Sequence, residues 1–172
     1  MSKLWQTSAI LGLDPTSRGI AFAFFERGKL LDWGTRRNDG DEMSVVDRLL
    51  ETYRPDTVVI EDPDAHRCER RSRVRALLRR IAVRARTERI NVILVSRYAV
   101  REDWKSRGFG NKHGVAKEIA KIFPEIEHLL PRRRKPYQSE QVRSDIFDAI
   151  SIVVRAFGVE ADAAVELVRR AA

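Results

Sequence analysis

The order in which strand-like and helix-like segments follow one another most constrains the fold of this chain. Three apolar segments come first, at residues 8–14, 19–26 and 29–36, and turn-like stretches join them. Further on, helical and strand-like segments alternate. A strand, a helix and a second strand in succession place the two strands parallel in one sheet. These later segments are predicted helices at 42–52, 67–88, 113–123, 142–157 and 160–170, and predicted strands within 56–62 and 91–96.

The predicted fold class is therefore α/β. We expect a mixed five-stranded sheet, three antiparallel strands followed by parallel ones, with helices on both faces. The 172 residues suit one domain spanning 1–172, and the 43% apolar content argues against disorder. The N-terminal stretch is interpreted as a strand, since it has no small-residue cleavage site of a signal peptide.

Charge and cysteine usage narrow the function classes. The chain has 33 basic and 25 acidic residues, a formal charge of +8, which favours nucleic acid first and an anionic membrane second. No apolar run is long enough to span a bilayer, and we expect no membrane partner. The single cysteine, Cys68, excludes an internal disulfide and suits the cytoplasm, while the three histidines lack the spacing of zinc ligands.

Four carboxylates stand where an apolar core would not place them. Asp14 ends the first strand and Glu61 the fourth, whereas Asp145 and Asp148 share one face near the start of a helix. If the first and fourth strands are neighbours, these positions meet at one end of the sheet. Clustered carboxylates resist ionisation unless a cation joins them, and hard oxygen donors suit Mg²⁺ or Mn²⁺. Two such ions about 4 Å apart can clamp both reacting oxygens of a phosphodiester.

Each carboxylate taken singly also fits a structural role. Asp14 precedes a proline and can be a turn residue, Glu61 can mark a strand exit, and Asp145 can complement a helix dipole. It is the joint placement on two strand ends and one helix face that favours a metal site.

Four stretches of the chain resemble, in order, the RuvC-type Holliday junction resolvases of the RNase H-like superfamily. Residues 10–25 (ILGLDPTSRGIAFAFF) look like that family's first strand and turn, and residues 57–62 (TVVIED) are similar to its second acidic strand. Residues 98–123 resemble the stretch after its fifth strand, and residues 144–157 (SDIFDAISIVVRAF) its terminal helix with the Asp-x-x-Asp-Ala signature.

This resemblance implies a Mg²⁺-dependent endonuclease, with Mn²⁺ as a substitute, that acts in DNA recombination and repair. Its catalytic and metal-binding acids map onto Asp14, Glu61, Asp145 and Asp148, with Asp14 between two metals. It further implies a homodimer that nicks two strands of a four-way DNA junction symmetrically. Lys105 and Lys112 are the expected holders of the scissile phosphate, although ordinary solvated loop charge explains them equally well.

The chain departs from the family pattern at three places. Thr16 stands where the family usually has glycine, and no aromatic wedge follows the second acidic strand. A basic insert, residues 129–143 (LLPRRRKPYQSEQVR), precedes the last acidic helix. The missing wedge bears on recognition of the junction more than on hydrolysis.

Arginines dominate the helix predicted at 67–88, where we expect an apolar stripe on the sheet and guanidiniums pointing outward. They are Arg67, Arg70, Arg71, Arg73, Arg75, Arg79, Arg80, Arg84 and Arg86. Arg70, Arg71 and Arg73 are predicted to bind nucleic acid, as are Arg132, Arg133 and Arg134 in a proline-flanked loop. A solvated helix face, a dimer surface and a solubilising loop are the alternatives. Trp104, expected in a polar loop, is the tryptophan placed to stack on bases.

Two other functions fit the same fold. One is a nuclease acting on RNA, RNA–DNA hybrid or other branched DNA. The other is a non-catalytic nucleic-acid-binding module, against which the complete set of four acids argues.

Overall fold

The computed structural model describes residues 3–16, 19–37, 40–131 and 143–159. Its strands are β1 (Ala9–Thr16), β2 (Gly19–Glu26), β3 (Lys29–Arg37), β4 (Thr57–Glu61) and β5 (Asn91–Val95). Its helices are α1 (Lys3–Thr7), α2 (Glu42–Tyr53), α3 (Ser72–Thr87), α4 (Arg97–Ser106), α5 (Lys112–Ile122), the 3-10 helix η1 (Pro124–Leu129) and α6 (Arg143–Phe157). None of these helices is long and apolar enough to cross a membrane.

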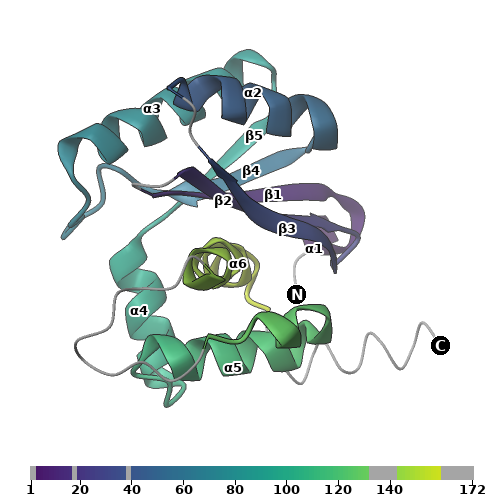
Figure 1. Ribbon diagram of the computed structural model, residues 1–172, viewed down its shortest axis with the longest axis vertical. Coiled ribbons are helices and arrows are strands. Elements are labelled where there is room, and N and C mark those ends of the chain that lie inside the picture. The colour runs from purple at the N-terminus through teal and green to yellow at the C-terminus, as the bar shows by residue number, and fades with distance from the viewer. Residues whose placement is uncertain (1–2, 17–18, 38–39, 132–142, 160–172) are drawn as a thin grey trace.

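The sheet is mixed, as predicted, and its strands lie in the order β3-β2-β1-β4-β5. β1 pairs antiparallel with β2, and β2 with β3, whereas β4 runs parallel to both β1 and β5. α2 and α3 cover one face, while α6 lies against the other with α4 and α5 beyond it (Figure 1). The expected contact between the first and fourth strands is therefore confirmed.

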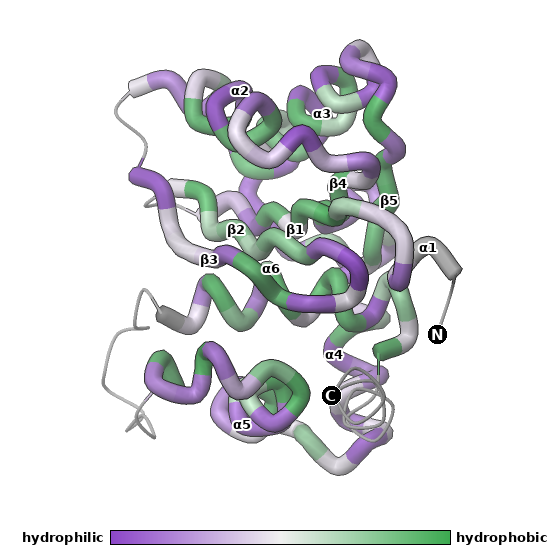
Figure 2. Tube along the Cα trace, turned by 90° about the vertical axis from the view of Figure 1, so that its right-hand side faces the viewer, coloured by the Kyte–Doolittle hydropathy of each residue, from purple (hydrophilic) through white to green (hydrophobic). Residues whose placement is uncertain are grey.

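Side-chain alternation along the strands divides the core into two clusters. Leu11 and Leu13 of β1 face α2 and α3, whereas Ile10 packs in the cluster that contains α6. In Figure 2 hydrophobic residues concentrate in the strands, and hydrophilic residues recur along the outer helices α2 and α3. Since residues two apart share a face, Gly12 and Asp14 lie on the α6 side.

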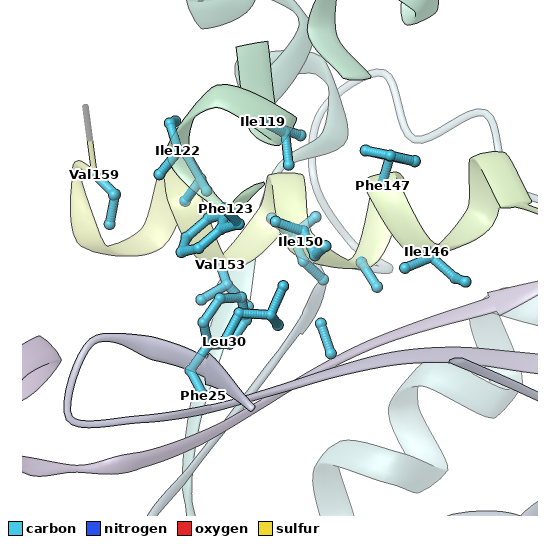
Figure 3. Close-up of a cluster of buried hydrophobic side chains, with 14 of the residues drawn as sticks. Phe25, Leu30, Ile119, Ile122, Phe123, Ile146, Phe147, Ile150, Val153 and Val159 are labelled. Carbon is cyan, nitrogen blue, oxygen red and sulfur yellow. The ribbon is translucent and has the colours of Figure 1, made fainter. Parts of the chain in front are cut away.

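α6 is the central helix of the hydrophobic cluster that contains Ile10. Its Ile150 and Val153 pack in one cluster with Phe25 of the sheet and Phe123 after α5, and the two phenylalanine rings meet edge-on with centroids 5.4 Å apart (Figure 3). Several further α6 side chains on other sides of the helix are also buried, among them Ala149, Ile152 and Val154. A helix that is apolar on all sides is typical of a protein core, and here its buried start carries the two aspartates.

The helix predicted at 67–88 begins at Ser72 instead. Arg67 has a positive φ of 61° and Arg71 is extended at the N-cap, so residues 67–71 form an irregular segment. The prediction of a longer helix is wrong because the chain must turn after β4 before α3 can lie across the sheet.

α4 was not predicted, and Trp104 lies in this helix rather than in a polar loop. Ser96 caps α4 by accepting a hydrogen bond from the amide of Ala99. Trp104 is 2% exposed and its indole Nε1–H donates to the Ser151 hydroxyl at 2.6 Å. The sequence of α4 is rich in charged residues, and its only buried residues are Val100 and Trp104, so its helical periodicity was not recognised. The predicted helix at 160–170 and the loop with Arg132, Arg133 and Arg134 lie outside the described residues.

Candidate functional site

The candidate site lies where β1 and β4 end against the start of α6. The last matched pair of these strands is Leu13 with Ile60, so the next residues, Asp14 and Glu61, stand side by side. Asp14 is 3% exposed and Glu61 1% exposed. Both share the α6 face of the sheet with Gly12 and Val59, two residues earlier.

Gly12 permits α6 to approach β1 closely. A Cβ atom at this position would stand 2.6 Å from Cγ2 of Val153 and 2.8 Å from the carbonyl oxygen of Ala149. Such distances are below van der Waals contact, so only glycine fits without a shift. This close approach brings the first turns of α6, with buried Asp145 and partly exposed Asp148, to the strand ends.

Arg70 binds the two strand-end carboxylates. Its Nε donates to Oε2 of Glu61 at 2.7 Å, and its second terminal nitrogen donates to Oδ1 of Asp14. The other terminal nitrogen reaches the carbonyl oxygen of Pro15 at 3.3 Å. The prediction that Arg70 points outward from a helix is wrong, because it precedes α3 and turns toward the end of the sheet.

Arg97 joins the carboxylates of three different elements. One terminal nitrogen lies 3.4 Å from Oδ1 of Asp14 and 3.3 Å from Oε2 of Glu61, and the other lies 2.7 Å from Oδ2 of Asp148. Asp14, Glu61 and Asp148 are therefore within reach of one guanidinium, as their predicted convergence requires. Sequence reasoning missed Arg97. The available signal was its position two residues after the end of β5, at the same end of the sheet as Glu61.

Lys112 adds a third cation to this group. Its ammonium Nζ lies 3.2 Å from Oδ2 of Asp148. It is the first residue of α5, whose N-cap is Asn111. Of the other residues predicted to bind nucleic acid, Lys105 and Arg71 are exposed, and Arg73 pairs with Glu42 at 2.8 Å.

Burial dominates the electrostatics of Asp14. It raises the pKa of this carboxyl from 3.8 to about 6, although Arg70 and Arg97 act to lower it; Asp148 and Glu61 raise it further. For Arg97, burial lowers the pKa, but the three carboxylates around it outweigh burial and raise the value above normal. The protein thus holds its acid cluster near neutrality with its own arginines.

The donor set suits a hard divalent cation in kind, since it consists of carboxylate oxygens. As they lie, however, no three Asp, Glu, His or Cys side chains among the described residues are arranged to hold a metal ion. Arg70 and Arg97 together bind one oxygen of each of Asp14, Glu61 and Asp148. A metal that takes these oxygens as ligands has to displace the guanidinium contacts.

The chain matches no family model and no curated protein. Its structure is similar to the T. thermophilus RuvC in complex with Holliday junction substrate, with TM-score 0.60, 17% identity, and coverage of 88% of this chain and 94% of that one. A second Thermus thermophilus RuvC structure matches with TM-score 0.57, 17% identity, and 88% and 98% coverage. The yeast mitochondrial Holliday junction resolvase Ydc2 matches with TM-score 0.60, 18% identity, and 88% and 78% coverage.

These similarities confirm the predicted resemblance at the level of the fold. The five-stranded mixed sheet with helices on both faces is the RNase H-like fold of RuvC.

Proposed function

We propose that this chain is a metal-dependent, structure-selective DNA endonuclease that resolves four-way junctions by hydrolysing phosphodiesters. The observation that carries this proposal is the meeting of Asp14, Glu61 and Asp148 around the guanidinium of Arg97. The fold shared with resolvase structures supports it further. From the resemblance to resolvases we further propose that the protein acts in DNA recombination and repair, as a cytoplasmic homodimer.

The residues that would hold Mg²⁺, or Mn²⁺ in its place, are Asp14, Glu61, Asp145 and Asp148. When bound, such ions supply Lewis-acid stabilisation of the phosphate and a more acidic attacking water.

The chain's own cations explain how the site could change when DNA enters. Arg70 and Arg97 have planar guanidiniums, which bind phosphate as readily as carboxylate. A phosphodiester at the strand ends would offer them a second anionic partner. We expect them to transfer part of their hydrogen bonds to it, which frees oxygens of Asp14 and Glu61. DNA and metal should then bind with positive coupling, each favouring the other.

Cleavage of defined substrates tests this function. Labelled four-way junction, flap, linear duplex and RNA–DNA hybrid are each incubated with Mg²⁺ or EDTA. We expect paired symmetric nicks on the junction, abolished by EDTA and by Asp14→Asn. Asp47→Asn is the matched control, since Asp47 pairs with Arg84 on the α2 side of the sheet. Cleavage by Asp14→Asn at the wild-type rate would show that the metal-site assignment is wrong. Cleavage of the hybrid or the flap in place of the junction would keep the nuclease activity and assign a different substrate.

A non-catalytic junction-binding module is the second candidate. The observation that favours it is the engagement of Asp14, Glu61 and Asp148 by Arg70 and Arg97, which leaves the acids neutralised without a metal. Tight junction binding without cleavage in either Mg²⁺ or Mn²⁺ would establish this function in place of the first.

A further inference from the structure

A cavity of about 250 Å³ opens beside the carboxylates, between α4, α5 and α6. Its walls are mainly apolar, formed by Val100, Trp104, Phe109, Val115, Phe147 and Ile152. It is smaller than the ~300–1,000 Å³ clefts that hold drug-sized ligands, so it suits one small planar group.

The walls of this cavity are held in place by contacts within the protein. The hydrogen bond from Trp104 to Ser151 fixes the indole between α4 and α6. Phe109 meets the Trp104 ring edge-on, with centroids 6.1 Å apart and planes at 72°. The Asn111 side chain accepts from the amide of Gly114 at 2.9 Å, which fixes the start of α5. The cavity is therefore preformed, and a ligand need not order its walls.

Charged side chains also line the cavity, namely Arg97, Arg101, Lys105 and Lys112 with two carboxylates, Glu102 and Asp148. Arg97, Arg101 and Lys112 already pair with carboxylates, whereas Lys105 is exposed and forms no ion pair with the described residues. An apolar interior with an exposed, unpaired cation in its lining complements a ligand with an apolar body and an anionic attachment. A nucleotide has this character, because a flat base is joined to a phosphodiester.

The cavity is continuous with the candidate site. Arg97 and Lys112 line the cavity, and both also contact Asp148. A base inside the cavity would therefore belong to a nucleotide next to the phosphate at the carboxylates. A base is withdrawn from the stack most cheaply where it is unpaired or mismatched, as at a branch point.

We propose that the cavity between α4, α5 and α6 receives one extrahelical nucleobase, adjacent to the phosphate presented to the carboxylates. This inference rests on the proposed action on branched DNA. It assigns recognition of the branch to a pocket, in a chain that has no aromatic residue directly after Glu61.

The test follows the base rather than cleavage. Four-way junctions carry 2-aminopurine at one position at a time around the branch point, in EDTA. Fluorescence anisotropy reports binding, and 2-aminopurine emission reports unstacking. We expect one position near the branch to change its emission when the wild-type protein binds. Val115→Phe, which fills the cavity, should remove that change and weaken junction binding about ten-fold or more.

Leu31→Phe is the matched control, since Leu31 is 51% exposed on β3 and lies near the end of the sheet opposite Asp14. It should keep both signals. Val115→Leu fills less of the cavity and should reduce the emission change and the junction affinity by less. It serves as the test variant if Val115→Phe fails to fold. The proposal is overturned if Val115→Phe or Val115→Leu preserves the emission change and affinity, or if the junction binds with no change at any position. Absence of junction binding by the wild type would instead overturn the proposed function.

Discussion

Asp14 is buried at the end of β1 with two guanidiniums against it, yet its pKa is raised to about 6. Loss of hydration, together with repulsion from Asp148 and Glu61, therefore disfavours the ionised carboxylate more than its two arginines favour it. Such a cost is typical of functional sites, where a group is placed for chemistry rather than for stability.

This cost predicts that Asp14→Asn stabilises the fold at neutral pH without metal. The folded pKa of about 6 exceeds the unfolded value of 3.8. The contribution of Asp14 to the free energy of unfolding is therefore fully present below pH 3.8 and is lost as pH rises through 6. Each pKa unit corresponds to about 1.4 kcal/mol. Asparagine cannot ionise and keeps its stability. We expect a higher Tm for Asp14→Asn at pH 7 in EDTA, with the gap closing toward pH 4. An equal or lower Tm at pH 7 would contradict this account.

Arg70 and Arg97 bind one oxygen of each of three carboxylates, so we expect them to compete with a metal for these oxygens. Arg70→Gln and Arg97→Gln should therefore each tighten Mn²⁺ binding in the absence of DNA, by about ten-fold or about 1.4 kcal/mol. Isothermal titration calorimetry measures this without reference to activity. Arg73→Gln is the control, since Arg73 is exposed and pairs with Glu42. Unchanged Mn²⁺ affinity in both variants would show that the arginines do not limit access of the metal.

Among the elements, the approach of α6 to β1 determines whether the acids meet. Alternation along the strands turns Asp14 and Glu61 toward α6, and the helical repeat of 3.6 residues puts Asp145 and Asp148 on one face of that helix. The two sets of side chains lie at the same end of the sheet. Gly12 sets the separation of the two elements, since its missing Cβ is the space that Val153 and Ala149 occupy.

Gly12→Ala should therefore disturb both the core and the site. The added methyl group has to displace the backbone of α6, and overpacking of this kind costs about 1–3 kcal/mol. Thermal unfolding measures this loss, and junction cleavage should fall with it because Asp148 moves away from Asp14. Gly114→Ala in α5 is the matched control, since its Cβ would meet only ordinary contacts at 3.5 Å or more. A Gly12→Ala protein as stable as Gly114→Ala would contradict this packing argument.

The chain carries a formal charge of +8, but of the basic side chains that the structure describes, only some are free of ion pairs with acids. Several arginines of α3 are neutralised by acids from other elements, as Arg79 is by Asp64 and Arg84 by Asp47. Arg71, Arg80 and Arg86 are exposed and form no ion pair with the described residues. Among the arginines of α3 and its N-cap, these three are the ones from which we expect phosphate contacts.

Neutralising them tests that expectation. Arg71→Gln, Arg80→Gln and Arg86→Gln combined should weaken junction binding and reduce the slope of log K against log salt by about 0.9 for each phosphate that the protein no longer neutralises. The matched control replaces Arg27, Arg54 and Arg89, which carry the same total charge but lie in the turns at the opposite end of the sheet from Asp14. Equal slopes for the two triple variants would show that α3 contributes only net charge.

Local sequence patterns were sufficient to predict the strands, most of the helices and the convergence of Asp14, Glu61 and Asp148, whereas the metal-binding role of the acids stays a prediction. These depend on periodicity, turn residues and the chemistry of neighbouring residues, which a short window contains. The pairing of β1 with β4 followed from the order of elements. The start of α3 at Ser72, and α4 with its buried Trp104, were not recovered from such windows.

The surroundings of the acids, in contrast, are a property of the folded chain alone. Arg70 lies 56 residues from Asp14 in the sequence and Arg97 lies 83 residues away. Arg70 was predicted to face outward toward nucleic acid, and Arg97 was missed. Their partners depend on which strand ends meet and on how much water is excluded there. An arginine is drawn to a carboxylate most strongly where both lose hydration, and burial of that kind arises only when distant segments pack together.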